Sequence, residues 1–124
     1  GVVCPIDHPL AKKESLRWEE LTQHRLIKNG TSRLLDDSEA NALLGHSQFY
    51  VSNMISLIAM LEAGFGITTL PWYAFPQEST KLVFIPLIKP QITRDIGLVM
   101  LKNKSLIPPA QALVDFIISR RENA

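Results

Sequence analysis

The sequence predicts an α/β fold in which short buried strands alternate with helices. Short apolar runs recur along the chain, segments with the apolar period of a helix lie between them, and Gly, Pro or Asn closes most of these segments. Strands that alternate with helices favour a largely parallel sheet covered on both faces. With 124 residues, the chain is long enough for one domain or for one lobe of a larger one.

The first 30 residues contain two predicted strands and a short helix. Residues 2–4 form an apolar run that stops at Pro5, and a loop follows. Residues 16–22 are expected to form a short helix with Ser15 as its N-cap. Residues 25–28 form the second strand, which ends at the turn pair Asn29-Gly30.

Two further helices are predicted in the middle of the chain. Thr31 or Ser32 is expected to cap a helix over residues 33–44, which Gly45 ends. After a strand at 48–51, Ser52 or Asn53 caps a helix that ends at Gly64. That helix is apolar on nearly all sides, so we expect it to pack on more than one side.

The last third of the chain is predicted to contain three strands and a final helix. The strands cover residues 67–70, 82–87 and 95–101, and a single helical turn is expected at 72–75. The final helix starts at Pro108-Pro109, because proline is tolerated in a first turn. Its apolar stripe consists of Ala110, Leu113, Phe116 and Ile117.

Composition and charge limit the possible functions. The formal net charge is +1, from 13 basic and 12 acidic residues, and this balance offers no electrostatic footprint for DNA. A single cysteine, Cys4, excludes an intrachain disulfide and fits a reducing, cytoplasmic setting. No apolar run approaches the roughly 18 residues of a membrane span. The chain opens in an apolar run without an initial Met, so we expect it to be a piece of a longer protein.

The two strand-to-helix junctions are the first candidate site. In a doubly wound sheet such loops lie at the carboxyl ends of the strands, where ligands bind. Helix N-termini at this edge would present N–H groups that suit a carboxylate or a phosphate, and Thr31, Ser32 and Ser52 would add hydroxyls. The alternative interpretation is that these residues only cap helices.

The segment 63–71 is the second candidate. Gly64 allows a left-handed helix end, and Gly66 lets the backbone pass close to a ligand or to another segment. These glycines follow a helix, so they do not form a dinucleotide-binding fingerprint, and no Walker lysine follows. The alternative is a helix stop with tight packing.

Catalytic interpretations find little support. Cys4 lies in an apolar run before proline, where a thiol is buried and inert. His8, His24 and His46 lack the spacing of metal ligands and are expected at the surface or at caps. The sequence also contains no Gly-x-Ser-x-Gly elbow. We therefore expect no enzyme, no catalytic residue, no metal and no cofactor.

Several segments together resemble the LysR-type transcriptional regulators. Residues 7–11 (Asp-His-Pro-Leu-Ala) are similar to a segment of that family, and residues 63–71 look like its Gly-rich stretch ending in Leu-Pro. Segments 82–87, 94–99 and 112–116 follow in the same order. The resemblance covers essentially the whole chain and implies an effector-binding domain of the type 2 periplasmic-binding-protein class. On that template residues 1–6 are a crossover strand and 7–87 the second lobe, and 88–124 return to the first lobe.

The resemblance also implies a function. A small-molecule effector would bind in the cleft between the lobes, and DNA only through an N-terminal domain that this chain lacks. Effector domains would pair into dimers, and the full-length protein would form a tetramer; no membrane contact is implied. Two alternatives stay open: a periplasmic solute-binding lobe, and a dehydratase-like enzyme of the same two-lobed fold. The implied effector-site residues are Thr31, Ser32, Ser52, Asn53, Phe65 and Gly66.

Overall fold

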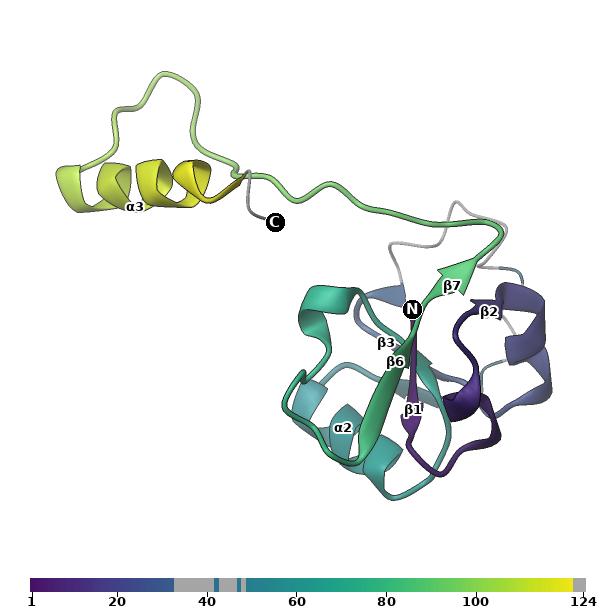
Figure 1. The fold of residues 1–124 in the computed structure, drawn as a ribbon. Helices are drawn as coiled ribbons and strands as arrows, with labels where there is room; N and C mark the ends of the chain where they lie inside the picture. The colour runs from purple at the N-terminus through teal and green to yellow at the C-terminus, as the bar shows by residue number, and fades with distance from the viewer. Residues whose placement is uncertain (33–41, 43–46, 48, 122–124) are drawn as a thin grey trace. The chain divides into compact units, whose positions relative to one another are not determined.

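The computed structural model describes residues 1–32, 42, 47 and 49–121. The predicted helix over 33–44, apart from Ala42, therefore lies outside the described residues, as do Gly45 and His46. The chain divides into two compact units, Gly1–Ile92 and Thr93–Ala124 (Figure 1). Each unit is described by itself below.

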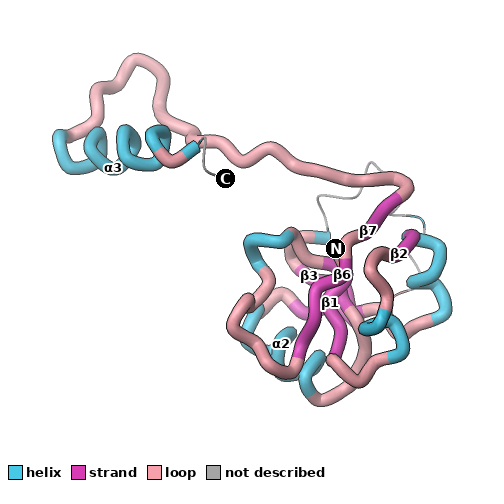
Figure 2. The backbone as a smooth tube through the Cα atoms, in the orientation of Figure 1, coloured by secondary structure: helices cyan, strands magenta, loops and turns pink. Residues whose placement is uncertain are grey.

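The first unit is built on a sheet in which one strand runs against its neighbours. β1 (Val2–Pro5) pairs antiparallel with β5 (Thr68–Thr69) on one side and with β6 (Leu82–Ile85) on the other (Figure 2). β3 (Ile27–Asn29) and β4 (Phe49–Val51) form a parallel pair.

The parallel pair joins the other strands at β5. Leu26 and Ile67 form a parallel bridge, and the Ile27 N–H donates to the Ile67 carbonyl over 2.8 Å. The order across the sheet is therefore β4, β3, β5, β1, β6. The sheet is mixed rather than largely parallel, because β1 pairs with strands from far along the chain and no crossover helix dictates its direction.

The alternation of side chains along β1 divides the core into two clusters. Val2 and Cys4 pack into one cluster with Leu16 and Trp18, whereas Val3 packs into the other with Ile27 and residues of α2. Successive side chains of a strand point to opposite faces, so β1 contributes to both. All three of these β1 side chains are fully buried.

Two predicted elements of this unit are divided differently in the structure. The helix expected at residues 16–22 is a short strand, β2 (Leu16–Arg17), followed by the 3-10 helix η2 (Trp18–Gln23). Arg17, not Ser15, is its N-cap, and the Arg17 N–H donates to the Glu20 carboxylate over 2.8 Å. The strand expected at 82–87 splits into β6 and β7 (Leu87–Ile88), because Pro86 has no N–H to donate. β7 pairs parallel with β2.

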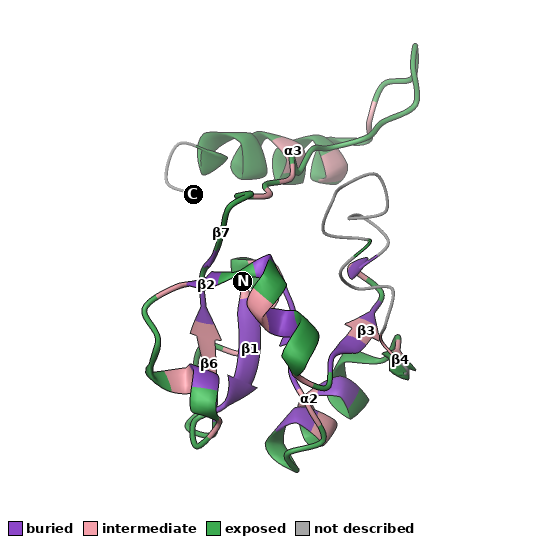
Figure 3. Cartoon of the chain, turned by 90° about the vertical axis from the view of Figure 1, so that its right-hand side faces the viewer, coloured by how far each residue is buried: buried purple, intermediate pink, exposed green. Residues whose placement is uncertain are grey.

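The helix α2 (Met54–Glu62) begins and ends as predicted but packs on one side only. Leu57 and Leu61 are buried, whereas Ile55 is 81% exposed. Figure 3 shows both buried and exposed residues along α2. The prediction that this helix packs on more than one side is therefore wrong within the described part of the chain. The 3-10 helices η1 (Pro9–Lys12) and η4 (Trp72–Ala74) also lie in this unit, the second at the predicted place.

The second unit contains the helix α3 (Pro108–Ser119), which starts at the two predicted prolines. The strand expected at residues 95–101 is absent from this described segment, where Ile96 is 72% and Val99 98% exposed. A strand forms only beside another strand, and the unit offers this segment none. No described helix is long and apolar enough to span a membrane.

Candidate functional site

The carboxyl ends of β3 and β4 lie side by side, and this end of the strands forms one edge of the sheet. The two strands are parallel, and Asn29 pairs with Val51 at their last positions. The chain leaves both strands here, so the loop Gly30–Ser32 and the pair Ser52-Asn53 start from neighbouring points. The structure thus places Thr31, Ser32, Ser52 and Asn53 at the same edge of the sheet.

Asn29 is the buried centre of this edge, with only 2% of its surface exposed. Its side-chain nitrogen donates to Thr68 Oγ1 over 2.8 Å and to the Thr69 carbonyl over 2.9 Å. Its side-chain oxygen accepts from both the backbone N–H and the hydroxyl of Thr31, at 2.8 and 2.6 Å. All the hydrogen-bonding capacity of the amide is used, which ties the Thr31 loop to β5.

Ser32 completes the loop from the other side. Its hydroxyl oxygen accepts the backbone N–H of Asn29 over 3.1 Å, and the side chain is buried. Ser32 therefore shapes the loop, whereas Thr31 is only partly buried.

Ser52 and Asn53 form the second junction, and both are exposed. The Asn53 side-chain oxygen caps α2 by accepting the Ser56 N–H over 3.0 Å. The N–H groups of Met54 and Ile55 have no helical carbonyl partner at this position, since the first turn of any helix lacks one. The junction therefore presents amide donors, a hydroxyl and the positive end of the helix dipole to solvent.

Phe65 and Gly66 lie at the opposite edge. Gly66 precedes the bridge residue Ile67, beside Arg25, where β3 begins; a Cβ at Gly66 would stand 2.4 Å from the Arg25 carbonyl oxygen. The close approach that Gly66 allows is thus to another backbone segment. The structure does not bring these two residues together with the other four.

The helix stop before Phe65 explains the preceding glycine. Gly64 has φ +78°, its N–H donates to the Leu61 carbonyl, and the Phe65 N–H donates to the Met60 carbonyl. This pair of bonds is the Schellman arrangement, which satisfies the last carbonyls of a helix. The helix-stop interpretation therefore accounts for Gly64.

Sequence reasoning included Asn29 in the first candidate junction without a site role of its own, and it did not single out Thr68. The pair Asn29-Gly30 is typical of a turn, and that pattern conceals the burial of the Asn29 side chain. Thr68 belongs to the two-residue strand β5 (Thr68–Thr69), and its hydroxyl donates to the Ile27 carbonyl over 2.6 Å. The available signal was a pair of threonines between the apolar residues Ile67 and Leu70, because a buried polar group needs a hydrogen-bond partner.

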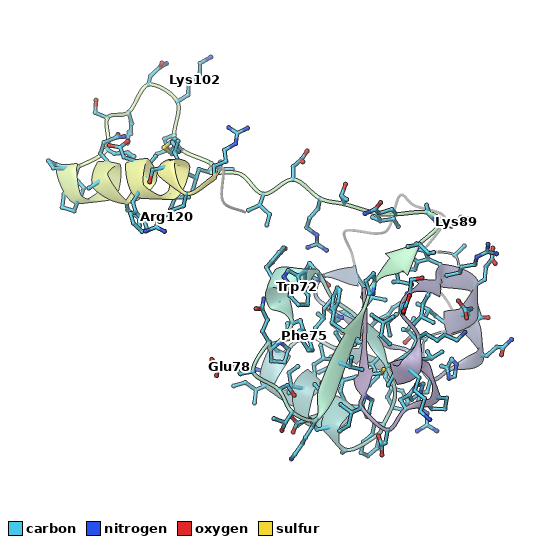
Figure 4. The ribbon with its side chains drawn as sticks, viewed as in Figure 1. Trp72, Phe75, Glu78, Lys89, Lys102 and Arg120 are labelled. Carbon is cyan, nitrogen blue, oxygen red and sulfur yellow. The ribbon has the colours of Figure 1, made fainter. Side chains whose placement is uncertain are left out.

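An aromatic cluster follows β5 in the first unit. Trp72, labelled with Phe75 in Figure 4, stacks on Phe75 at 5.9 Å between ring centroids. Trp72 also makes a T-shaped contact with Phe84, with the ring centroids 5.1 Å apart. Trp72 remains 56% exposed. These contacts support packing at the end of the sheet.

The described residues show no catalytic or metal-binding arrangement. Cys4 is fully buried, and desolvation together with the nearby Asp7 carboxylate raises the pKa of its thiol to about 11. The His8 ring caps η1 by accepting the Leu10 N–H over 3.2 Å. Burial, and to a smaller extent the neighbouring His24, lowers the pKa of the His8 ring. No three potential ligands among these residues could hold a metal ion.

The fold is of the type 2 periplasmic-binding-protein class. The sequence matches the family described as the LysR substrate binding domain over residues 1–122. The chain therefore belongs to the LysR substrate-binding domain family.

The relatives matched are transcriptional regulators. The chain is 32% identical over 124 residues to the uncharacterized HTH-type transcriptional regulator YbhD of Escherichia coli K12, covering 95% of this chain and 39% of that protein. It is also 32% identical to the DNA-binding transcriptional dual regulator OxyR of the same strain, covering 94% of this chain and 40% of OxyR. The chain thus spans well under half the length of these relatives.

Solved structures share the fold. The reduced form of OxyR superposes with a TM-score of 0.74 at 27% identity, covering 96% of this chain and 58% of that one. The effector binding domain of QuiR in complex with shikimate gives a TM-score of 0.77 at 23% identity. The match covers 98% of this chain and 60% of that chain. At that lower identity the likeness concerns the fold alone.

Proposed function

We propose that the chain is the effector-sensing part of a LysR-type transcriptional regulator, with the effector bound at the edge formed by Thr31, Ser32, Ser52 and Asn53. Family membership supports the class of protein. The observation that carries the site is the parallel pairing of Asn29 with Val51, which sets two loops with polar side chains side by side. A ligand that reaches this edge can contact both loops at once.

The proposed effector is a small anion that carries a carboxylate. The four site residues are uncharged, so the attraction comes from amide groups and the dipole at the start of α2. Ser52 adds a hydroxyl that can donate to a carboxylate oxygen. Among structural relatives, QuiR is described with shikimate and the CcmR regulatory domain with 2-PG, and both ligands agree with this proposal.

Sensing would act through the arrangement of two lobes. Residues 7–87 would supply the second lobe and residues 1–6 a crossover strand, whereas residues 88–124 would supply the return crossover and the C-terminal helix of the first lobe. An effector that binds the closed arrangement more tightly shifts the population toward it, by as much as its affinities for the two arrangements differ. In this proposal the chain acts in the cytoplasm without enzymatic activity. Effector domains pair within a tetramer, and DNA binds elsewhere in the full-length protein.

Calorimetric titration of the full-length protein with a panel of small carboxylates tests the proposal. We expect Ser52→Ala to weaken binding of a recognised acid about tenfold, the usual worth of one hydrogen bond to a charged group. Thr80→Ala is the matched control, since Thr80 is an exposed hydroxyl before β6, at the opposite edge of the sheet. Equal losses in the two variants, or no binding of any carboxylate, would contradict the proposed site.

A further inference from the structure

The last segment of the first unit, residues 86–92, is attached to β2 by backbone pairing. Leu16 is aligned with Leu87 in the parallel pair of β2 with β7, and the Leu16 N–H donates to the Pro86 carbonyl over 2.9 Å. Leu16 and Leu87 are both buried in the same core cluster. The start of the segment is therefore fixed by hydrogen bonds and by apolar packing.

Trp18 extends this attachment beyond β7. Its side chain is buried, and its indole N–H donates to the Pro90 carbonyl over 2.9 Å. Ile92 is partly buried against the core cluster that contains Trp18. Lys89, labelled in Figure 4, has φ +53°, a left-handed conformation that residues with a side chain rarely adopt. Such a conformation persists only where the surrounding contacts enforce it, and here contacts fix the chain on both sides of Lys89.

We infer that Trp18 is a positioning residue, which holds residues 89–92 to the first unit so that the connection that follows can pivot only from Thr93 onward. The first compact unit ends at Ile92, and residues 93–101 form no helix or strand. The consequence rests on the proposed function: residues 89–92 would move with the second lobe when an effector changes the arrangement of the lobes. A shorter free connection has fewer conformations, so a change in one lobe constrains the other more closely.

Distances between two spin labels, measured by pulsed electron paramagnetic resonance on the full-length protein, test this role. The labels are attached to Gln91→Cys and Ala59→Cys, both at exposed positions, the second on α2, and the buried Cys4 takes up no label. Unlabelled protein is added in excess so that only distances within one copy are recorded. We expect a single narrow distance distribution. It should broaden when Trp18→Phe removes the indole N–H, because a freed segment samples many conformations.

Two controls separate positioning from general stability. Trp72→Phe makes the same change at an exposed tryptophan of the same unit and should leave the distribution narrow. A second label pair, Gln23→Cys with Ala59→Cys, reports on η2 itself and should stay narrow in Trp18→Phe. A distribution from position 91 that stays narrow in Trp18→Phe, or equal broadening in both label pairs, would overturn the inference. The measurement needs no effector, so the proposed function is tested separately by the carboxylate titration.

Discussion

The side-chain amide of Asn29 donates a hydrogen bond of 2.8 Å to the hydroxyl of Thr68, which joins β3 to β5 across 39 positions of the sequence. The Thr68 hydroxyl in turn donates to the Ile27 carbonyl. The loop that carries Thr31 is therefore fixed by a buried polar network rather than by apolar packing. Such a network holds a single geometry, because every broken bond leaves a buried group unsatisfied.

Replacing Asn29 by Ala is expected to lower the free energy of unfolding by about 3 kcal/mol, since buried donors and acceptors of Thr31, Thr68 and Thr69 lose their partner. Urea unfolding of the full-length protein measures this loss. Gln23→Ala, at an exposed position, is the control and should change stability by less than about 0.5 kcal/mol. Similar stabilities for the two variants would show that the network contributes little.

Replacing Gly66 by Ala is expected to destabilise the protein by about 2 kcal/mol. The new Cβ would stand 2.4 Å from the Arg25 carbonyl oxygen, so two backbone segments must move apart. Gly97→Ala is the matched control, because a Cβ there meets no atom within 4 Å. Thermal unfolding compares the two, and an equal effect would argue against the close approach of Gly66 to Arg25.

The raised pKa of the Cys4 thiol predicts that the stability of the fold depends on pH. The pKa of the folded thiol is about 11 against an ordinary value of 9.0, so the folded state holds its proton more tightly than the unfolded chain does. The stability from the neutral thiol is fully present below about pH 9 and is lost as the pH rises toward 11. Cys4→Ala should remove this part of the pH dependence. If the free energies of unfolding of the two proteins change by the same amount between pH 8 and pH 11, the expectation is contradicted.

Asn53→Asp separates the stability of α2 from ligand binding. Aspartate keeps the cap on the Ser56 N–H and suits the positive end of the helix, so stability should hold or rise. The added negative charge should weaken binding of a carboxylate about tenfold, the effect of like charges near 6 Å at intermediate dielectric. Asn53→Ser is the uncharged control cap. Unchanged affinity in Asn53→Asp would place the carboxylate away from α2.

Local signals in the sequence predicted those elements that depend on nearby residues. The Asn53 cap, the Gly64 stop and the prolines at the start of α3 each act within one helical turn, and the structure confirms all three. Elements that depend on distant partners were predicted less well. The reversal of β1 depends on pairing with residues more than 60 positions away, and residues 95–101 form no strand without a neighbour.

The same difference between local signals and distant partners applies to the candidate site. The sequence predicted two polar loops at strand ends, and the register of β3 with β4 places them side by side. The roles within the loops depend on burial, which the pattern Asn-Gly does not reveal. Asn29 turned out to be the buried centre, and Gly66 to serve a backbone contact at the other edge.

Hydrogen–deuterium exchange of the full-length protein, with and without a recognised carboxylic acid, tests the central claim most directly. The account predicts slower exchange of backbone amides in residues 29–32 and 52–56, at the carboxyl ends of β3 and β4, and no change at residues 64–67. Protection confined to residues 64–67, or absent from both loops while the acid is bound, would contradict an effector site at this edge of the sheet.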